Sequence, residues 1–487
     1  MNFKVISRNV GYALLVSALF MLLSIFVSIA NGNDSALAAL VISFSITFIV
    51  GIFPFIFVRG SSNITLKEGY VIIFLSWMLS FVFGMLPYAL YGEPFSLANA
   101  WFESVSGFTA TGGTILDDVE VLPNSLLFWR SSTHFIGGLG IVVFLLLIIP
   151  DTSPVRFRLT NMELSSISRD GYRSQTRKMV SIFTYVYLGL IVSLFVCYLI
   201  AGMPLFHAVN QAFSVSATGG FSTRTASIGA FDSVAIDIIT IVYMFLASVH
   251  FGLIFIVFFT RSLRPLANPV FRFYVGMLVT ASVVMAVILR PGSTSWGRAF
   301  LDGTFHAVSY ASTSGFAIAD NSQWGMLPCF ILLTLSMICG CAGSTTGGIK
   351  IDRILVLFKA IGRQIKLAVH PSAVTEIKFG KTVIHDEAVY PQVLFIALYF
   401  IIMALSILLC LLVGDPNHHA VSGTISNLGT VGLSVGSIGS AGSYNAEPAA
   451  MKFIFTMDMF LGRVEIYPIL AVLSSAFSFR RKRPGII

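Results

Sequence analysis

The sequence contains few charged residues. Asp, Glu, Lys and Arg make up 11% of its 487 residues, whereas 56% are hydrophobic, and soluble globular chains carry about 25% charged residues. A soluble fold of this composition would expose large apolar patches and aggregate, and a disordered chain would carry far less apolar surface. The apolar segments are continuous runs, which argues against a β-barrel of alternating strands. The composition therefore predicts an all-α polytopic membrane protein.

Catalytic motifs are also lacking. The chain contains no His-Glu-x-x-His sequence and no paired intramembrane aspartate motif, so a membrane-embedded enzyme is only a distant alternative. The five cysteines are scattered and do not form a disulfide framework. We therefore expect no enzyme and no cofactor in this chain.

Basic residues set the expected orientation. Cutting the chain at charged residues leaves ten segments long enough to span a bilayer, each needing about 20 apolar residues. With the N- and C-termini in the cytoplasm, 24 of the 30 Lys and Arg residues fall on the inner side, as the positive-inside rule requires. The net charge of +8 is then a topology signal, and no nucleic-acid partner is expected. The ten expected spans are Arg8–Asp34, Ser35–Val58, Gly69–Gly92, Ser131–Pro150, Met179–Ala201, Ile238–Thr260, Phe273–Leu289, Asn321–Ile349, Ala388–Gly414 and Phe453–Phe479.

Four of the outer connections share a pattern. Each holds a short apolar segment rich in Ser and Thr that leads to a glycine, and each lies between two expected spans. The pairs Glu103–Gly112, Gln211–Gly220, His306–Gly315 and Ala420–Gly429 are all nine residues apart. A repeat of this kind argues for duplication. It predicts four helix–pore-helix–helix units (69–175, 176–266, 267–385 and 386–487) after an N-terminal helix pair (1–68).

Such a unit suits a cation pathway. A segment of about ten residues cannot cross the bilayer, but it can enter as a half-helix and return as extended backbone where protein or water surrounds it. Four such segments around one pseudo-fourfold axis would point helix C-termini inward and turn carbonyl oxygens toward an ion. The alternative is four re-entrant turns that only pack helices. His207, His306, His418 and His419, near the half-helix starts, are read as capping or interfacial residues and not as metal ligands.

Several motifs together resemble the Trk/Ktr/HKT superfamily of potassium transporters, most closely its bacterial TrkH-type membrane subunits. They are Val105-Ser-Gly-Phe-Thr-Ala-Thr-Gly112, Trp129-Arg-Ser131, Gly137-Gly-Leu-Gly-Ile141, Gly219-Gly-Phe-Ser-Thr223, Ala342-Gly-Ser-Thr-Thr-Gly-Gly-Ile-Lys350 and Gly462-Arg-Val-Glu465. The resemblance implies potassium uptake across the cell inner membrane by a homodimer. It also implies a cytosolic nucleotide-binding regulatory subunit of the RCK/KTN type.

The resemblance assigns potassium, the transported ion, to a selectivity filter. The filter residues would be Thr111, Gly112, Gly219, Gly220, Ser314, Gly315, Leu428 and Gly429. In the second unit the register is open between Gly219 and Gly220, and Gly220 is preferred because Gly-Phe then matches Gly315-Phe316. Glycine at all four positions goes with potassium preference in this superfamily.

The eighth expected span ends in a glycine-rich stretch. Each of its glycines weakens a helix by roughly 1 kcal/mol relative to alanine, so we expect the span to break into a loop below the filter. Helix capping with loose packing is the alternative. The resemblance makes this loop a gate, formed by Gly340, Gly343, Ser344, Thr345, Thr346, Gly347 and Gly348.

Arg463 lies inside the tenth expected span. A cation near mid-membrane costs at least ~2.5 kcal/mol on insertion scales, so it should face water or a partner. Structural pairing with Asp458 or Glu465 is one reading. The resemblance favours the other, a barrier in the cavity under the filter, partly neutralised by a carboxylate.

Some alternatives stay open at this stage. A sodium-permeable protein, or a symporter coupled to H⁺ or Na⁺, would fit the same superfamily. A carrier with inverted repeats is disfavoured, because each unit here has two spans and keeps the same order of parts. The seven bases between Lys350 and Lys381 suggest a docking surface for the regulatory partner or for anionic membrane lipid.

Overall fold

The computed structural model describes residues 2–58, 66–140, 176–373, 375–379, 382–384, 386–415, 419–440 and 442–479. Residues 141–150 of the fourth expected span, the bases between Arg156 and Arg173, His418 and the basic tail 480–487 lie outside the described residues.

The described chain is almost entirely helical, as expected. Its helices are α1 (Phe3–Ala30), α2 (Leu37–Phe57), α3 (Leu66–Gly84), α4 (Leu86–Tyr91), α5 (Leu97–Phe108), α6 (Asn124–Leu139), α10 (Thr176–Ile200), α11 (Leu205–Ser216), α12 (Val234–Ser248), α13 (Phe251–Thr260), α14 (Pro269–Leu289), α15 (Trp296–Ala311), α16 (Met326–Ile338), α17 (Ile351–Val369), α18 (Asp386–Val413), α19 (Ala420–Leu428), α20 (Ala449–Val464) and α21 (Ile466–Phe479). Strands β1 (Ile377–Phe379) and β2 (Thr382–Ile384) form a small antiparallel hairpin between α17 and α18, with Lys378 paired to Val383.

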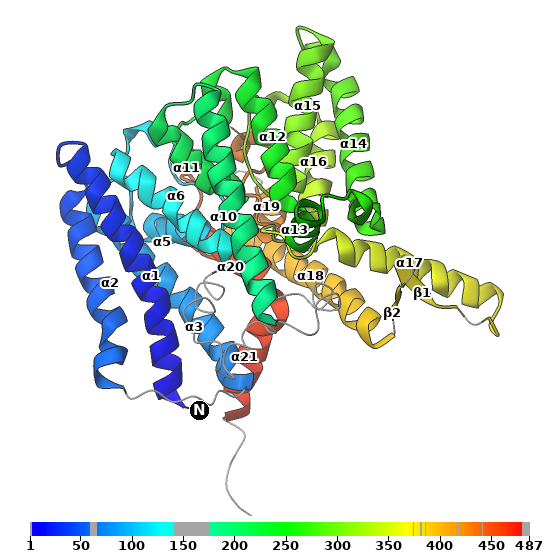
Figure 1. Ribbon diagram of the computed structural model, residues 1–487, viewed down its shortest axis with the longest axis horizontal. Helices are drawn as coiled ribbons and strands as arrows, with labels where there is room; N and C mark the ends of the chain where they lie inside the picture. The colour runs from blue at the N-terminus through cyan, green and yellow to red at the C-terminus, as the bar shows by residue number, and fades with distance from the viewer. Residues whose placement is uncertain are drawn as a thin grey trace, which may run out of the picture.

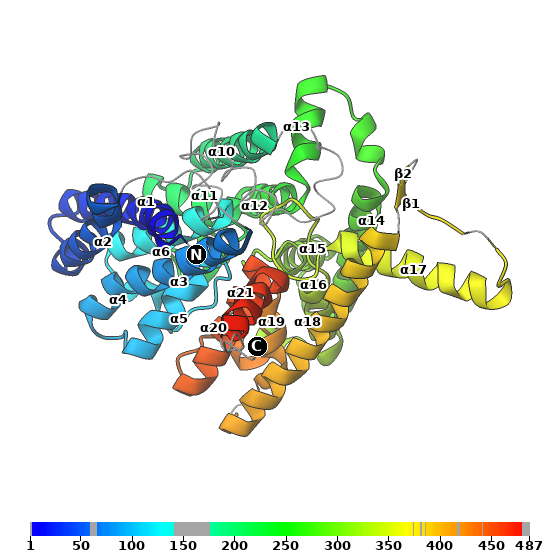
Figure 2. The same ribbon diagram turned by 90° about the horizontal axis from the view of Figure 1, so that it is seen from below.

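The N-terminal pair α1 and α2 lies side by side at one edge of the bundle (Figure 1). The two helices approach closely at Gly11 and Gly51, where a Cβ on Gly11 would come within 2.7 Å of the Gly51 carbonyl oxygen. Small residues at such contacts let membrane helices pack without side chains between them. At the opposite edge α17 and the β-hairpin project away from the bundle in both views (Figures 1 and 2).

Six described helices are long and apolar enough to cross a membrane, and the pair α12–α13 would make a seventh although it is bent by 105°. The expected count of ten is therefore not reached among the described residues. The other three expected spans are short or interrupted: α6 ends at Leu139, α16 at Ile338, and α20 at Val464 directly before α21. The bent pair α12–α13 and these three spans each follow a short helix, whereas the spans that precede the short helices are continuous.

Candidate functional site

Four short helices end in the same unusual backbone turn. α5, α11, α15 and α19 are each followed by a non-glycine residue with positive φ and, two residues later, by a glycine with positive φ. The first set is Ala110 (51°), Thr218 (54°), Thr313 (54°) and Thr430 (56°). The glycines are Gly112 (84°), Gly220 (90°), Gly315 (64°) and Gly432 (76°). We call residues 110–114, 218–222, 313–317 and 430–434 ring segments one to four.

The four segments contact one another in a closed cycle. A Cβ on Gly112 would lie 2.1 Å from the Gly219 carbonyl oxygen, and a Cβ on Gly220 would lie 2.9 Å from that of Ser314. A Cβ on Gly315 would lie 2.1 Å from the Val431 oxygen, and one on Gly432 would lie 2.2 Å from the Thr111 oxygen. Glycine is therefore needed at each position for its backbone angle and for the close approach. The cycle brings together the main chains that carry the carbonyls of Thr111, Gly219, Ser314 and Val431.

A serine six residues before each ring glycine braces its segment. The amide of the residue before each glycine donates to the serine carbonyl at 2.9 Å in all four segments, from Thr111, Gly219, Ser314 and Val431 to Ser106, Ser214, Ser309 and Ser426. In three segments the serine hydroxyl also donates to the carbonyl of the residue after the glycine: Ser106 to Gly113 at 2.6 Å, Ser309 to Phe316 at 2.7 Å and Ser426 to Leu433 at 2.7 Å. These bonds fix the extended backbone against the end of its own helix.

Six of the eight expected residues lie in this ring. They are Thr111, Gly112, Gly219, Gly220, Ser314 and Gly315. In the second segment Gly220 takes the position of the other glycines, and Gly219 supplies the neighbouring carbonyl.

The expected register of the fourth segment is wrong by three residues. Gly429 caps α19 with ordinary helical angles, and a Cβ there would meet the Ser336 carbonyl oxygen of α16 at 2.4 Å. Leu428 is the last residue of α19. Their places in the ring are taken by Gly432 and Val431. The chosen spacing failed because α19 has only nine residues, so counting from its start selected the first of two nearby glycines.

A signal for the correct register was present in the sequence. The spacing Ser-x₅-Gly occurs at Ser106, Ser214, Ser309 and Ser426 and selects Gly432. Residues Gly432–Gly436, which begin in the fourth segment, also match the pattern Gly-x-Ser-x-Gly. It follows a helix and not a β-strand, so it is not the nucleophile elbow that this pattern marks in hydrolases.

Each ring segment is also tied to the segment before it in the cycle. The carbonyl two residues after each ring glycine accepts one hydrogen bond from the preceding unit. The bonds run from the Tyr444 amide to Thr114 at 2.9 Å, from Arg130 Nη1 to Ser222 at 3.2 Å, from the Gly229 amide to Ala317 at 3.2 Å and from the Tyr310 hydroxyl to Ser434 at 2.6 Å. The donors differ chemically, but the accepting position is the same.

A buried ion pair supports the first two segments. Arg130 is 1% exposed and Glu103 is fully buried, and Arg130 Nε donates to Glu103 Oε1 at 2.7 Å. Glu103 also accepts from the Thr114 hydroxyl at 3.0 Å and from the Ile115 amide at 3.1 Å. The pair therefore joins α5, α6 and the first segment, and Arg130 extends the link to the second segment.

Arg130→Ala is expected to destabilise the protein by about 3–5 kcal/mol, because it leaves the Glu103 carboxylate buried without its cation. The matched control is Arg224→Ala, which breaks the ion pair with Glu120, whose side chains are 41% and 42% exposed. Exposed pairs contribute about 0–1 kcal/mol. Thermal unfolding in detergent measures both variants. Equal, small losses of stability would contradict a structural role for the buried pair.

The expected break after the eighth span is present. α16 ends at Ile338 and α17 begins at Ile351, and the intervening residues 339–350 form a loop. The loop fits into the bend between α12 and α13: the Cys341 amide donates to the Ser248 carbonyl and the Phe251 amide donates to the Gly343 carbonyl, both at 2.9 Å. Two interrupted backbones thus satisfy each other's polar groups, which is required where no water is available.

The same loop lies against the ring. The Thr218 hydroxyl of segment two donates to Thr345 Oγ1 at 3.2 Å. A Cβ on Gly347 would come within 2.1 Å of Thr430 Oγ1 in segment four, and one on Gly348 would approach the Gly429 Cα at 3.6 Å. The loop therefore touches two opposite segments of the ring.

Arg463 links this loop to the end of α6 by hydrogen bonds. Its guanidinium donates to the Thr345 carbonyl through Nη1, and through Nη2 to the carbonyls of Gly137 at 2.6 Å and Gly138 at 3.0 Å. The carboxylates expected to pair with it have other partners. Asp458 accepts from Ser406 Oγ at 2.6 Å, and Glu465 binds Arg353 at 2.9 Å. Among the described contacts, Arg463 therefore meets backbone carbonyls, while Asp458 and Glu465 bond to other side chains.

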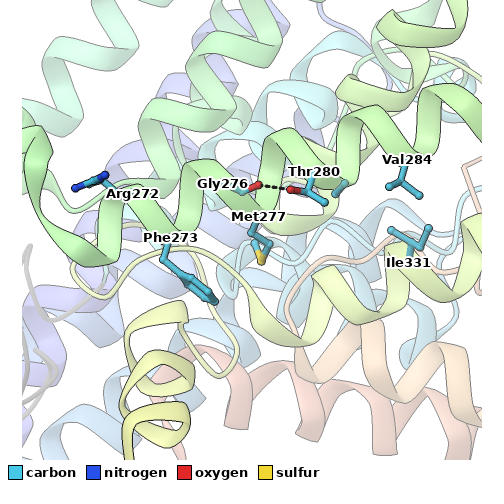
Figure 3. A pocket seen from close by; sticks show the side chains of 8 residues that line it. Arg272, Phe273, Gly276, Met277, Thr280, Val284 and Ile331 are labelled. Carbon is cyan, nitrogen blue, oxygen red and sulfur yellow. Dashed lines mark hydrogen bonds between the residues drawn. The ribbon is translucent and has the colours of Figure 1, made fainter. Parts of the chain in front are cut away.

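Two hollows differ in character. A small cavity of about 100 Å³ is lined by Gly138, Thr345, Lys350 and Arg463 among others, directly beside the loop. A larger one of about 650 Å³ is lined by Phe273, Met277 and Val284 of α14 and by Ile331 of α16, which lies beside Val284 (Figure 3). It is lined by apolar side chains apart from Arg272 and Thr280, and no ring or loop residue borders it. The small cavity therefore belongs to the site, and the larger one is an apolar hollow outside it.

Three of the histidines expected near the half-helix starts, His207, His306 and His419, lie in or directly before the short helices. His207 Nδ1 bonds Thr223 Oγ1 at 2.7 Å, His306 is buried in α15 and bonds the Ala319 carbonyl at 3.2 Å, and His419 bonds Glu447 at 2.6 Å. Within the described ranges, no three His, Cys, Asp or Glu side chains gather as a metal cluster.

Apolar helices of membrane length surround a ring of main-chain segments whose residues are uncharged. These features are those of a membrane transport protein. The family model of TrkH, described as a cation transport protein, matches residues 37–481. The chain therefore belongs to the TrkH family.

Individual relatives span almost the whole chain. It is 30% identical to the Trk system potassium uptake protein TrkH of Salmonella typhimurium, over 98% of this chain and 99% of the relative. It is 31% identical to the protein of the same description in Halomonas elongata, over 98% and 99%. The crystal structure of the potassium transporter TrkH from Vibrio parahaemolyticus superimposes with a TM-score of 0.87 at 30% identity, covering 98% of this chain and all of that one.

Proposed function

We propose that this protein takes up potassium across the cell inner membrane, and that the ring of four segments is its selectivity filter. The closed cycle of glycine-to-carbonyl contacts carries the proposal, because a ring of main-chain oxygens can replace the water shell of K⁺. The relatives' descriptions as potassium uptake proteins support the choice of ion. Potassium would be bound by Thr111, Gly112, Gly219, Gly220, Ser314, Gly315, Val431 and Gly432, the last two in place of Leu428 and Gly429.

The surroundings of the ring favour a cation. The four short helices end at the ring, so their partly negative C-termini point toward it. The ring segments contain no ionised side chain, which leaves neutral carbonyls as the ligands. The recurrence of an interrupted helix in each unit, at α6, α12–α13, α16–α17 and α20–α21, supports a pseudo-fourfold pore of four units with the boundaries given above. The proposed topology has ten spans and cytoplasmic termini. The described N-terminus and the end of α21 lie at the same end of the bundle (Figure 1).

Reversal potentials of the purified protein in liposomes with mixed K⁺ and Na⁺ test this function. We expect a clear K⁺ preference in the wild type, which Gly432→Ala reduces at least tenfold, because the added Cβ would overlap the Thr111 carbonyl oxygen. The matched control is Gly429→Ala, whose Cβ would press on Ser336 outside the ring; it should change flux but keep the ion preference. A wild type without K⁺ preference would end the proposal, and the reverse ranking of the two variants would refute the register.

We further propose that the loop 339–350 is a gate and that Arg463 is a barrier beneath the filter. The gate residues Gly340, Gly343, Ser344, Thr345, Thr346, Gly347 and Gly348 occupy the space between the ring and the inner side. Arg463 supports this role through its contact with Thr345 and its place at the small cavity. A positive charge there opposes cation passage.

Arg463→Ala should raise K⁺ flux by about tenfold, which corresponds to lowering the barrier by ~1.4 kcal/mol. Arg463→Lys keeps the charge and should stay close to the wild-type rate. Radioactive-rubidium or potassium uptake into liposomes, normalised to incorporated protein, measures both. An unchanged rate in the alanine variant would remove the barrier role, and an equal rise in both variants would assign the effect to the lost hydrogen bonds instead.

Helix α17 is the proposed link to a cytosolic nucleotide-binding regulatory subunit. Its first turn is tied to the loop, since Asp352 accepts from the Ala342 amide at 2.5 Å and the Ile351 amide donates to Gly340 at 2.9 Å. Farther along, α17 projects from the bundle and carries Lys359, Arg363 and Lys366 (Figure 2). A partner that moves this helix would move the gate. Anionic lipid is a second partner for these bases.

A homodimer is also proposed. Large apolar side chains on α17, among them Phe358, Ile361 and Ile365, are exposed. The apolar hollow on α14 adds to this surface, since Phe273, which lines it, contacts Phe358 with ring centroids 6.4 Å apart. A second copy of the chain would cover both.

Coupling of uptake to H⁺ is the second candidate function, and Asp458 favours it over sodium permeability. Asp458 is 1% exposed, and its Oδ2 has no hydrogen-bond partner among the described residues. Ionisable groups at membrane depth commonly mark ion or proton pathways.

Asp458→Asn should abolish K⁺ accumulation driven by a pH gradient and leave downhill K⁺ flux intact, because the amide keeps the shape of the side chain but cannot exchange a proton. Ser406→Ala, which removes only the neighbouring hydroxyl, is the control and should retain coupling. Fluorescent pH and K⁺ indicators in the same liposomes provide the readout. Equal behaviour of wild type and Asp458→Asn would exclude Asp458 as the coupling group.

A further inference from the structure

Ring segment two departs from the bracing pattern of the others. Ser106, Ser309 and Ser426 donate their hydroxyls to a carbonyl of their own segment. The matching serine, Ser214, instead bonds the Nδ1 atom of His134 at 2.8 Å. His134 is on α6, which belongs to the preceding unit. The second segment thus has a brace from outside its own sequence repeat.

His134 fills the space behind this segment. It is fully buried, and its imidazole stacks on the Phe221 ring with centroids 4.2 Å apart and an interplanar angle of 18°. A Cβ on Gly219 would come within 2.3 Å of His134 Nδ1. The imidazole therefore packs directly against Gly219, the residue that supplies the carbonyl of segment two.

Arg130, one helical turn before His134, secures the other face of the same segment. Its guanidinium lies over the Phe221 ring at 4.0 Å from the centroid and donates to the Ser222 carbonyl. Phe221 is thus held between a cation and an imidazole, both from α6. Movement of α6 or loss of the imidazole would be transmitted to Gly219 and Gly220.

We propose that His134 is a positioning residue for the second segment and that the preference for K⁺ over Na⁺ depends on it, an inference that rests on the proposed filter. In the snug-fit account of selectivity, the smaller Na⁺ is rejected because the carbonyls are prevented from closing around it. The Ser214 hydroxyl bonds His134 where the matching serines bond a carbonyl of their own segment. In segment two this restraint therefore comes from the His134–Ser214 hydrogen bond.

Two substitutions separate the hydrogen bond from the stack. His134→Phe keeps a flat ring against Phe221 but removes Nδ1, and should lower the K⁺/Na⁺ permeability ratio about fivefold, the effect of one buried hydrogen bond. His134→Asn places a polar atom near the Nδ1 position and should stay within about twofold of the wild type. A ratio in His134→Asn as low as that of His134→Phe would overturn the assignment to the hydrogen bond.

The repeated serines provide the matched control. Ser214→Ala alone should lower the ratio as much as His134→Phe, and the double variant should lower it no further, because both remove the same bond. Ser309→Ala breaks the brace of segment three, so its effect should multiply with that of His134→Phe. If the loss of K⁺/Na⁺ preference in the double variant equalled the product of the two single losses, the proposal would be refuted.

A measurement independent of transport uses K⁺-dependent thermal stability in detergent. An ion bound only by the folded ring raises the unfolding temperature. His134→Phe should shrink the excess protection by K⁺ over Na⁺, in addition to any loss of stability that is the same in both ions. An unaltered difference, with an unaltered permeability ratio, would overturn the role of His134. A wild type without K⁺ preference in either assay would instead sink the proposed function.

Discussion

Holding four main-chain segments together around one axis is the constraint on which the rest of this structure depends. Carbonyl oxygens that converge repel one another, and the ring residues carry no charge that could offset this repulsion. The protein meets it with layers of restraint. Glycines allow the close approach, serine hydroxyls fix three of the segments to their own helices, and hydrogen bonds from the preceding unit fix each segment to its neighbour.

The interrupted helices follow from the same constraint. A short helix that stops at the ring leaves room below it, and the next helix of each unit breaks there: after Leu139, Ser248, Ile338 and Val464. Broken backbone at membrane depth is costly unless its polar groups are paired. Here the loop 339–350 pairs with the α12–α13 bend, and Arg463 pairs with the end of α6 and with that loop. The element under the ring is thus held by exchangeable hydrogen bonds and not by a continuous helix.

Much of this arrangement could be predicted from the sequence. Long uncharged runs identified the continuous helices, and the repeated Ser/Thr-rich segments located the ring glycines of the first and third units and narrowed the second to Gly219 or Gly220. The fourth was placed three residues too early because the nine-residue spacing was counted from Ala420, the first residue of α19, whereas Glu103, Gln211 and His306 lie inside their helices. The Arg463 contacts failed for another reason. Carboxylates near in sequence lay on the same helix, whereas the acceptors are carbonyls more than a hundred residues away.

Quasi-symmetry explains why such contacts are hard to read from sequence. The four hydrogen bonds from a preceding unit to a ring segment reach equivalent carbonyls, but their donors are two backbone amides, one arginine and one tyrosine. What the fold keeps is the position of the acceptor, since it determines the shape of the ring. Any donor that reaches it will serve, so the units diverged in their side chains. The imidazole behind segment two is a further case, in which a neighbouring helix replaced a bond that the other segments make internally.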